Sequence, residues 1–113
     1  MKLPAEFRTT AKELASRVAR GDAVWILDVR EPREFEICRV PGSTLIPLGE
    51  LPKRLAELPD PVTGPDIVVH CKAGVRSAKA LALLREHGYE RIRNLDGGVV
   101  DWVKQVDPSQ STY

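Results

Sequence analysis

The sequence predicts an α/β domain built on a parallel sheet of about four or five strands, with helices on both faces. Short apolar runs alternate along the chain with segments of helical periodicity, which is typical of repeated strand–helix–strand units. The run at 23–27 is apolar throughout and the run at 67–69 is β-branched throughout, as expected of strands buried on both faces. A chain of 113 residues is long enough for one domain with a modest core.

An N-terminal helix is predicted from a capping motif. Thr10 and Glu13 have the spacing of a capping box, and Leu14 with Val18 places an apolar stripe on the helix that follows. Gly21 is a suitable residue to end this helix. We expect it to serve as scaffold.

The next stretch is predicted to contain two strands and two helices. The apolar strand at 23–27 comes first, and Pro32 then suits the first turn of a short helix. A brief strand is expected at 44–46. Leucines at i, i+4 and i+7 predict a helix over 51–58, which a proline-rich turn stops.

The second half of the chain is predicted to contain two further strands, each followed by a helix. These are a strand at 67–69, a helix from Ser77 to His87 that Gly88 ends, a strand at 92–95 and a helix at 99–106. Trp102 is the expected core anchor of the last helix. The whole chain, 1–113, is predicted to be one domain with a core at about 9–106 and a flexible tail at 107–113.

Composition narrows the function classes. A net charge of +1 argues against nucleic-acid binding through bulk electrostatics, and no apolar run approaches the length of a membrane span. With no signal-peptide pattern at the N-terminus, we expect a cytoplasmic protein. The two cysteines, Cys38 and Cys71, are then expected to be free thiols. Because no paired ligand spacing is present, we expect no metal, and we predict no cofactor.

The most informative stretch is His70–Ser77, which places a cysteine where a strand ends and a helix begins. In such a turn, successive backbone amides and the positive end of the helix dipole make an anion site. Lys72 and Arg76 add positive charge on either side of Gly74. These features favour the thiolate of Cys71 and lower its pKa. Cys71 is therefore the predicted nucleophile.

Two simpler interpretations compete with this one. Cys71 could be an ordinary buried cysteine, although packing alone would need neither the glycine nor the two cations. Cys38 could be the nucleophile instead. Its neighbours Glu34 and Glu36 would oppose a thiolate, while Arg39 would favour it.

The Cys71 loop, Cys71-Lys72-Ala73-Gly74-Val75-Arg76-Ser77, resembles the active-site loop of the rhodanese family, whose members carry sulfur as a cysteine persulfide. Other motifs of that family match in order along almost the whole chain: Leu27-Asp28-Val29-Arg30-Glu31-Pro32, Glu34-Phe35, Val40-Pro41-Gly42-Ser43, Ile46-Pro47-Leu48 and Leu95-Asp96-Gly97-Gly98 with Trp102. Many members have Gly-His where this chain has Cys38-Arg39, so a histidine has no role there.

The resemblance implies a sulfurtransferase of the thiosulfate sulfurtransferase kind. Cys71 would be catalytic, and the substrate-binding residues would be the rest of the loop: Lys72, Ala73, Gly74, Val75, Arg76 and Ser77. Asp28 and Arg30 would frame the site at the end of a strand, where open parallel sheets build their sites. Cys71 would accept sulfur from a sulfane-sulfur donor, either thiosulfate or the persulfide of a desulfurase.

A finer similarity concerns the acceptor. The run Glu36–Ser43 and the ending Val106-Asp107-Pro108 are similar to the rhodanese domain at the C-terminus of E1-like adenylyltransferase–sulfurtransferases of molybdopterin and thiocarboxylate pathways. This implies a ubiquitin-like sulfur-carrier protein, or the E1-like adenylyltransferase, as a partner. A small thiol or cyanide is the simpler acceptor.

Two other functions remain open on the sequence. A cysteine phosphatase or arsenate reductase of the Cdc25-like type also uses a cysteine in an amide cradle. Such enzymes place five residues between cysteine and arginine, whereas four separate Cys71 from Arg76. The other reading is a noncatalytic docking or regulatory module. Retention of the cysteine, glycine and arginine together argues against it.

Overall fold

A five-stranded parallel sheet forms the centre of the molecule. The computed structural model describes residues 3–113, and within this range the strand order is β1-β5-β4-β2-β3. The strands are β1 (Arg8–Thr9), β2 (Val24–Asp28), β3 (Thr44–Leu45), β4 (Asp66–His70) and β5 (Ile92–Leu95). Each pair of neighbours is parallel, which confirms the predicted α/β class and sheet.

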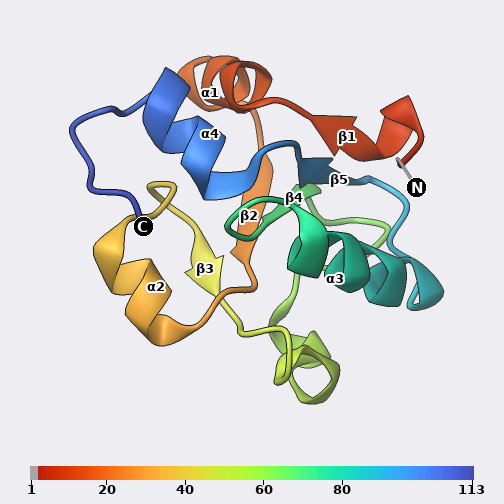
Figure 1. Cartoon of the computed structure of the whole chain (residues 1–113). Helices are drawn as coiled ribbons and strands as arrows, with labels where there is room; N and C mark the ends of the chain where they lie inside the picture. The colour runs from red at the N-terminus through yellow and green to blue at the C-terminus, as the bar shows by residue number, and fades with distance from the viewer. Residues whose placement is uncertain (1–2) are drawn as a thin grey trace.

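Helices cover both faces of this sheet (Figure 1). They are α1 (Ala11–Ala19), α2 (Pro32–Ile37), α3 (Val75–Glu86) and α4 (Gly98–Gln105), with short 3-10 turns at Ala5–Phe7, Leu51–Lys53 and Leu55–Glu57. The capping box that opens α1 is present, with Thr10 and Glu13 each bonding the other's backbone N–H. Pro32 occupies the first turn of α2 as predicted.

The alternation of side chains along the strands divides the core in two. Leu27 and Val69 point toward α3, in a cluster that also holds Leu81 and Leu84. Ile26 and Val68 point the other way, toward α1 and α4, in a cluster with Leu14, Val99 and Trp102. Successive residues of a strand face opposite sides, so this division follows from the period of two. Trp102 is buried in the second cluster, as expected of a core anchor.

Two elements differ from the sequence prediction. The helix expected over 51–58 is two separate 3-10 turns, because Arg54 between them leaves the helical conformation with φ of −121°. Pro52 lies in the first turn, where a proline is tolerated. Leu51 and Leu58 are nevertheless buried. Strand β1 was not predicted. It has only two residues and pairs with β5 at the edge of the sheet.

The sheet register brings the candidate site residues to one edge. Asp28, the last residue of β2, lies beside His70, the last residue of β4. Cys71 follows directly. The carboxyl ends of the two central strands therefore present Asp28 and Cys71 at the same edge, as is usual for sites in open parallel sheets.

Candidate active site at the Cys71 loop

The Cys71 loop turns from the end of β4 into α3. Gly74 immediately precedes the first residue of α3 and has φ of +121°. A side chain is strained at this φ, and a Cβ there would also lie 3.6 Å from Asn94 Nδ2. The helix begins at Val75, earlier than the predicted Ser77. Ser77 is consequently inside the first turn of α3, beneath the loop.

The start of α4 holds the loop by its backbone. The N–H of Val99 donates to the carbonyl of Cys71 at 2.9 Å, and the N–H of Val100 donates to the carbonyl of Lys72 at 3.3 Å. A Cβ on Gly98 would collide with the Lys72 carbonyl. This is the close backbone approach that the glycine turn predicts.

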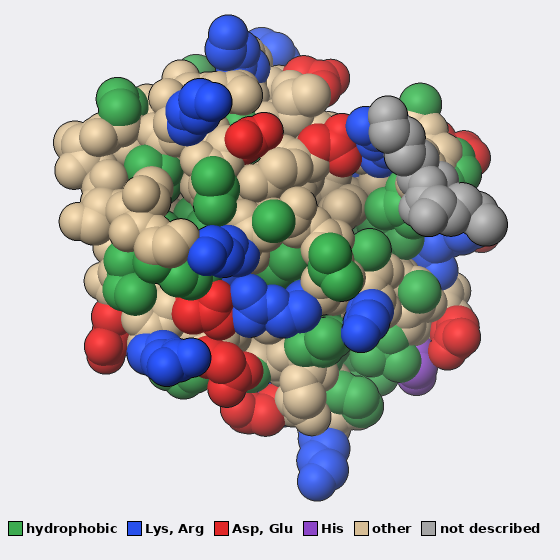
Figure 2. Space-filling view, in the orientation of Figure 1, with side chains coloured by type: hydrophobic (Ala, Val, Ile, Leu, Met, Phe, Trp, Pro, Cys, Tyr) green, Lys and Arg blue, Asp and Glu red, His purple; other side chains and the backbone are tan. Residues whose placement is uncertain are grey.

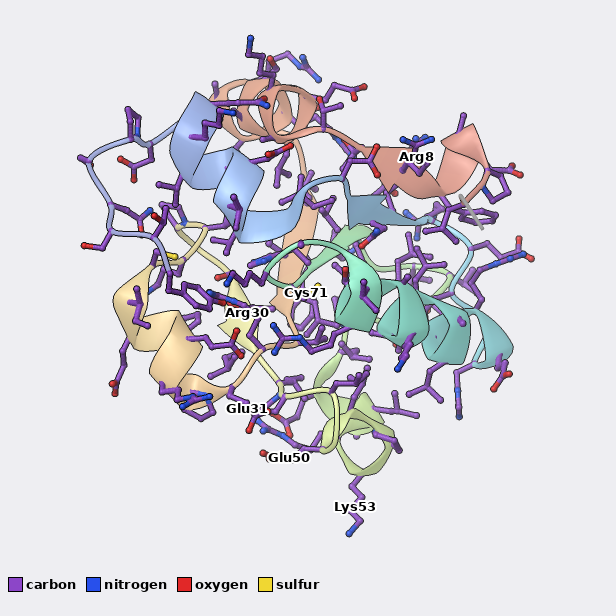
Figure 3. All side chains as sticks on the ribbon, viewed as in Figure 1. Arg8, Arg30, Glu31, Glu50, Lys53 and Cys71 are labelled. Atoms are coloured by element: carbon purple, nitrogen blue, oxygen red, sulfur yellow. The ribbon has the colours of Figure 1, made fainter. Side chains whose placement is uncertain are left out.

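The thiol of Cys71 accepts hydrogen bonds from the start of α3. The N–H of Gly74 donates to Sγ at 3.1 Å, and Ser77 Oγ lies 3.3 Å from Sγ. Burial raises the pKa of Cys71, but the Ser77 hydroxyl and the amides of Ser77, Gly74 and Ala73 outweigh it, so that the pKa is lowered. Figure 3 shows Cys71 beside the first turn of α3. The geometry favours a thiolate held by neutral donors.

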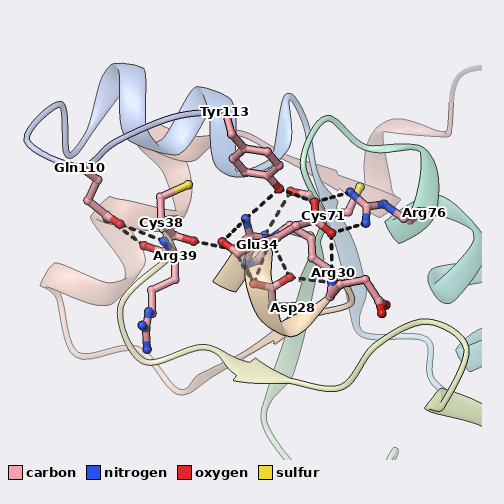
Figure 4. Close-up of polar contacts among 11 residues, drawn as sticks. Asp28, Arg30, Glu34, Cys38, Arg39, Cys71, Arg76, Gln110 and Tyr113 are labelled. Carbon is pink, nitrogen blue, oxygen red and sulfur yellow. Dashed lines mark hydrogen bonds and ion pairs between the residues drawn. The ribbon is translucent and has the colours of Figure 1, made fainter. Parts of the chain in front are cut away.

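Arg76 is held by a carboxylate of helix α2. Its two terminal nitrogens donate to Glu34 Oε1 at 2.7 Å and Oε2 at 2.9 Å (Figure 4). The hydrogen bonds from Arg76 lower the pKa of the largely buried Glu34 to about 2. Glu34 in turn raises the pKa of Arg76, and the nearby charge of Cys71 adds to this rise. Arg76 is thus close enough to influence Cys71 while it is paired elsewhere.

Tyr113 joins the same network from the C-terminal segment. Its hydroxyl donates to Glu34 and accepts a hydrogen bond from Arg30 at 2.9 Å. Lys72 Nζ lies 4.4 Å from the centroid of the tyrosine ring, which is a cation–π distance. Gln110 bonds both the backbone N–H and the carbonyl of Arg39, each at 2.8 Å. The segment predicted as a flexible tail therefore contacts the candidate site.

Asp28 and Arg30 form a fully buried ion pair behind the site. Arg30 Nη2 lies 2.8 Å from Asp28 Oδ2, and both side chains are inaccessible to solvent. Burial opposes the charge of Arg30, yet the hydrogen bonds that Arg30 donates to Asp28 and Tyr113 raise its pKa. Arg30 also donates to the carbonyl of Cys38 at 2.7 Å. The pair connects the end of β2 to α2 and to the C-terminal segment. That Asp28 and Arg30 frame a functional site stays a prediction.

The remaining loop residues face outward. Ala73 and Val75 are exposed, Val75 by 71%. Ala73 and Gly74 border a cavity of about 190 Å³ that Asn94 and Gly97 also line. A larger cavity of about 480 Å³ surrounds the starts of β4 and β5, at the opposite edge of the sheet. The small cavity borders the Cys71 loop at Ala73 and Gly74, although the thiol itself does not line it.

Cys38 lies on the other side of the sheet from Cys71. Both are buried free thiols. Cys38 packs in the cluster of α1 and α4, whereas Cys71 packs in the cluster of α3. Apolar surroundings give Cys38 none of the hydrogen bonds that Sγ of Cys71 accepts. This placement favours Cys71 as the nucleophile.

Two residues of the network carried no clear signal in the sequence. The sequence marks Glu34 as an acidic neighbour of Cys38 and as part of a family motif, without assigning it a role, and Tyr113 stands at the end of a polar segment. The family motif that includes Glu34 was the available hint. Nothing in the pattern around Tyr113 indicates its position.

Two kinds of feature are absent from residues 3–113. No three His, Cys, Asp or Glu side chains in that range come together so that they could hold a metal ion. No helix in the same range has the length and apolar character needed to cross a membrane.

Comparison with known proteins agrees with this geometry. The family described as "Rhodanese-like domain" matches residues 10–105. A protein of Allochromatium vinosum named "Sulfurtransferase" is 33% identical over 98 residues, which cover 87% of this chain and 89% of that protein. The "Probable adenylyltransferase/sulfurtransferase MoeZ" of Mycobacterium tuberculosis is 39% identical over 106 residues.

The match to the second relative is partial in length. It covers 92% of this chain but only 26% of the Mycobacterium tuberculosis protein. Among solved structures, a rhodanese-related protein of Thermoplasma volcanium superimposes with a TM-score of 0.77 at 29% identity, over 88% of this chain and 92% of that one. The fold, the order of the motifs and these relatives lead to one conclusion: the chain belongs to the rhodanese-like family of sulfurtransferases.

Proposed function

We propose that the protein is a sulfurtransferase that carries sulfane sulfur as a persulfide on Cys71. The observation that supports this most directly is the pair of contacts on Sγ, from the Gly74 amide at 3.1 Å and from Ser77 Oγ at 3.3 Å. Donors fixed around a sulfur stabilise its anion without reorganising during the reaction. They serve the thiolate first and the persulfide anion afterwards.

The reaction takes place in two half-reactions. The Cys71 thiolate attacks the outer sulfur of the donor, a bond forms between the two sulfurs, and the donor's own sulfur–sulfur bond breaks. Thiosulfate then leaves as sulfite, and a persulfide donor leaves as a thiolate. In the second half-reaction a nucleophilic acceptor takes the outer sulfur and the Cys71 thiolate returns. No net oxidation occurs and no cofactor is needed.

The proposed acceptor is a ubiquitin-like carrier protein with an extended C-terminal Gly-Gly tail, activated as an acyl-adenylate. With this acceptor the persulfide is the nucleophile: its outer sulfur attacks the C-terminal carbonyl of the carrier and AMP leaves. A small thiol then reduces the resulting acyl disulfide, which releases the carrier thiocarboxylate and returns the Cys71 thiolate. The similarity to an adenylyltransferase/sulfurtransferase supports this choice. The loop offers space for such a tail, because Ala73 and Gly74 are small and lie beside a shallow cavity. The partner that activates the carrier would be an E1-like adenylyltransferase. Without an E1-like adenylyltransferase, the acceptors would be small thiols or cyanide.

Intact mass spectrometry tests the proposal. After incubation with thiosulfate and removal of excess reagent, we expect the wild-type protein to gain the mass of one sulfur atom. Cys38→Ser should gain it too, whereas Cys71→Ser should not. Sulfur uptake by Cys71→Ser, or none by the wild type with either thiosulfate or a persulfide, would contradict the proposal and favour the noncatalytic interpretation.

A phosphatase function has less support in the geometry. The guanidinium of Arg76 is bound end-on to Glu34 and is not free to wrap an oxyanion at the thiol. The loop is also one residue shorter than a phosphatase loop. An assay with an aryl phosphate should therefore show no Cys71-dependent turnover.

A further inference from the structure

Both cations of the Cys71 loop are already engaged by other side chains. Arg76 uses both terminal nitrogens on Glu34, at 2.7 and 2.9 Å (Figure 4). Lys72 Nζ lies 4.4 Å from the centroid of the Tyr113 ring. More widely, basic and acidic side chains alternate over the face that Figure 2 shows, rather than gathering into a patch of one sign. Lys72 and Arg76 are therefore not free to bind an incoming anion.

Glu34 is fixed by the fold before any donor arrives. It is only 8% exposed, and it lies in the first turn of α2. Its Oε1 accepts the backbone N–H of Glu31 at 3.0 Å, and its Oε2 accepts the hydroxyl of Tyr113. The Arg76 side chain is 35% exposed. A carboxylate with three sets of donors therefore holds a guanidinium that reaches the surface next to the thiol.

This pairing bears on which sulfur donors the site prefers. Thiosulfate brings a sulfonate group, whose oxygens are recognised best by a free guanidinium through two parallel hydrogen bonds. A persulfide brings no oxyanion at the reacting end, and its leaving group is a plain thiolate. A guanidinium that is already paired with a carboxylate binds the sulfonate of thiosulfate weakly. A persulfide has no sulfonate, so its reaction does not need the guanidinium.

We propose that Glu34 is a specificity-determining residue, which withholds Arg76 from sulfonate-bearing donors and so directs the site toward persulfides. The inference rests on the proposed sulfurtransferase function. Glu34 acts through Arg76 and does not touch the reacting sulfurs. In the favoured reaction, the Cys71 thiolate attacks the outer sulfur of R–S–SH and forms a new sulfur–sulfur bond. The sulfur–sulfur bond of the donor breaks, and its electron pair leaves on R–S⁻.

The experiment compares three donors with each variant. Thiosulfate, cysteine persulfide and a persulfidated cysteine desulfurase supply the sulfur, and cyanide accepts it. We expect Glu34→Gln to lower KM for thiosulfate by about tenfold, because an unpaired guanidinium then meets the sulfonate. Its kcat should change little. Both persulfide donors should change by less than about threefold in kcat/KM, since neither presents an oxyanion there.

Two further variants keep the test interpretable. Glu36→Gln makes the same change of charge on an exposed position of α2 and should leave all three donors unchanged. The charge-neutral double variant Glu34→Gln/Arg76→Gln keeps groups that can hydrogen-bond to each other. It should retain the wild-type ratio of thiosulfate to persulfide use, even if the single variant does not fold.

Distinct results would overturn the inference. An unchanged KM for thiosulfate in a folded Glu34→Gln protein would do so, as would a loss of more than about tenfold in thiosulfate use by the double variant, since Arg76 would then serve thiosulfate in the wild type. If no donor loads the wild-type protein, the proposed function fails as well. If all donors load it and the variants change them in parallel, only the role of Glu34 fails.

Discussion

At the scale of single residues, the candidate site depends on neutral donors more than on the cations beside it. The Ser77 hydroxyl and the Gly74 amide contact Sγ of Cys71, while Lys72 and Arg76 contact Tyr113 and Glu34. Neutral donors hold an anion without attracting every other anion in solution. A sulfur held in this way is stabilised mainly by short-range geometry, and screening by salt affects it little.

Ser77→Ala should raise the pKa of Cys71. Ser77 is buried, and its hydroxyl is the largest of the influences that lower this pKa. A hydrogen bond to a charged group contributes about 1.5–3 kcal/mol, so losing it should move the alkylation midpoint of Cys71 clearly to higher pH. The rate of alkylation against pH, measured in a Cys38→Ser background, gives the value directly. A variant that titrates like its parent would show that the hydroxyl does not hold the thiolate.

At the scale of elements, the loop is shaped by three segments that meet at its backbone. Strand β4 delivers Cys71, helix α3 supplies the hydrogen-bond donors, and the start of α4 fixes the carbonyls of Cys71 and Lys72. Helices α3 and α4 therefore do more than cover the sheet, because each makes specific contacts with the Cys71 loop. The first turn of α4 determines where the loop can lie.

Gly98→Ala should destabilise the protein by more than the strain of a positive φ alone, because it should also displace the Cys71 loop. The new Cβ would meet the Lys72 carbonyl, which is backbone and cannot rotate away. Gly21→Ala is the matched control, because Gly21 also has positive φ, +78°, but has open space around it. We expect the control to lose about 1–2 kcal/mol in urea unfolding, and Gly98→Ala to lose more and to alkylate with an altered pH profile. Equal losses would count against the contact.

Sequence reasoning succeeded for elements with a strong local signal and failed where tertiary contacts decide. The capping box at Thr10 and the β-branched strand before Cys71 could be predicted because the residues of each segment favour its structure locally. The region 51–58 could not, because its leucine spacing suits a helix while Arg54, in the middle of the region, leaves the helical conformation. The position of Arg76 is set by Glu34, forty-two residues earlier, and no local pattern reports such a pairing.

At the scale of the whole molecule, Glu34 links three regions of the chain. It connects α2 to the Cys71 loop through Arg76 and to the C-terminal segment through Tyr113. The Asp28–Arg30 pair lies directly behind it and touches the same tyrosine. Regions that are distant in sequence are therefore joined by charge at the edge of the sheet, outside the apolar core.

The stability of the fold should consequently fall in acid. The pKa of Glu34 is about 2, below its ordinary value of 4.5, because Arg76 hydrogen-bonds its charged form. Its contribution is therefore complete above the unfolded pKa and is lost as pH falls through the window from about 4.5 to about 2, by up to roughly 3 kcal/mol. Urea unfolding across this window should show a shallower decline in Glu34→Gln than in the control Glu36→Gln. If the stability of both variants falls equally with pH across this window, the contribution of Glu34 is contradicted.

The sheet between the two cysteines also determines how a loaded sulfur can leave. Cys38 is the only other thiol of the chain, and it packs against the opposite face. A persulfide formed on Cys71, as proposed, would therefore meet no second thiol of these 113 residues that could attack it and close a disulfide. Within this domain the sulfur would stay on Cys71 until a recipient molecule arrives.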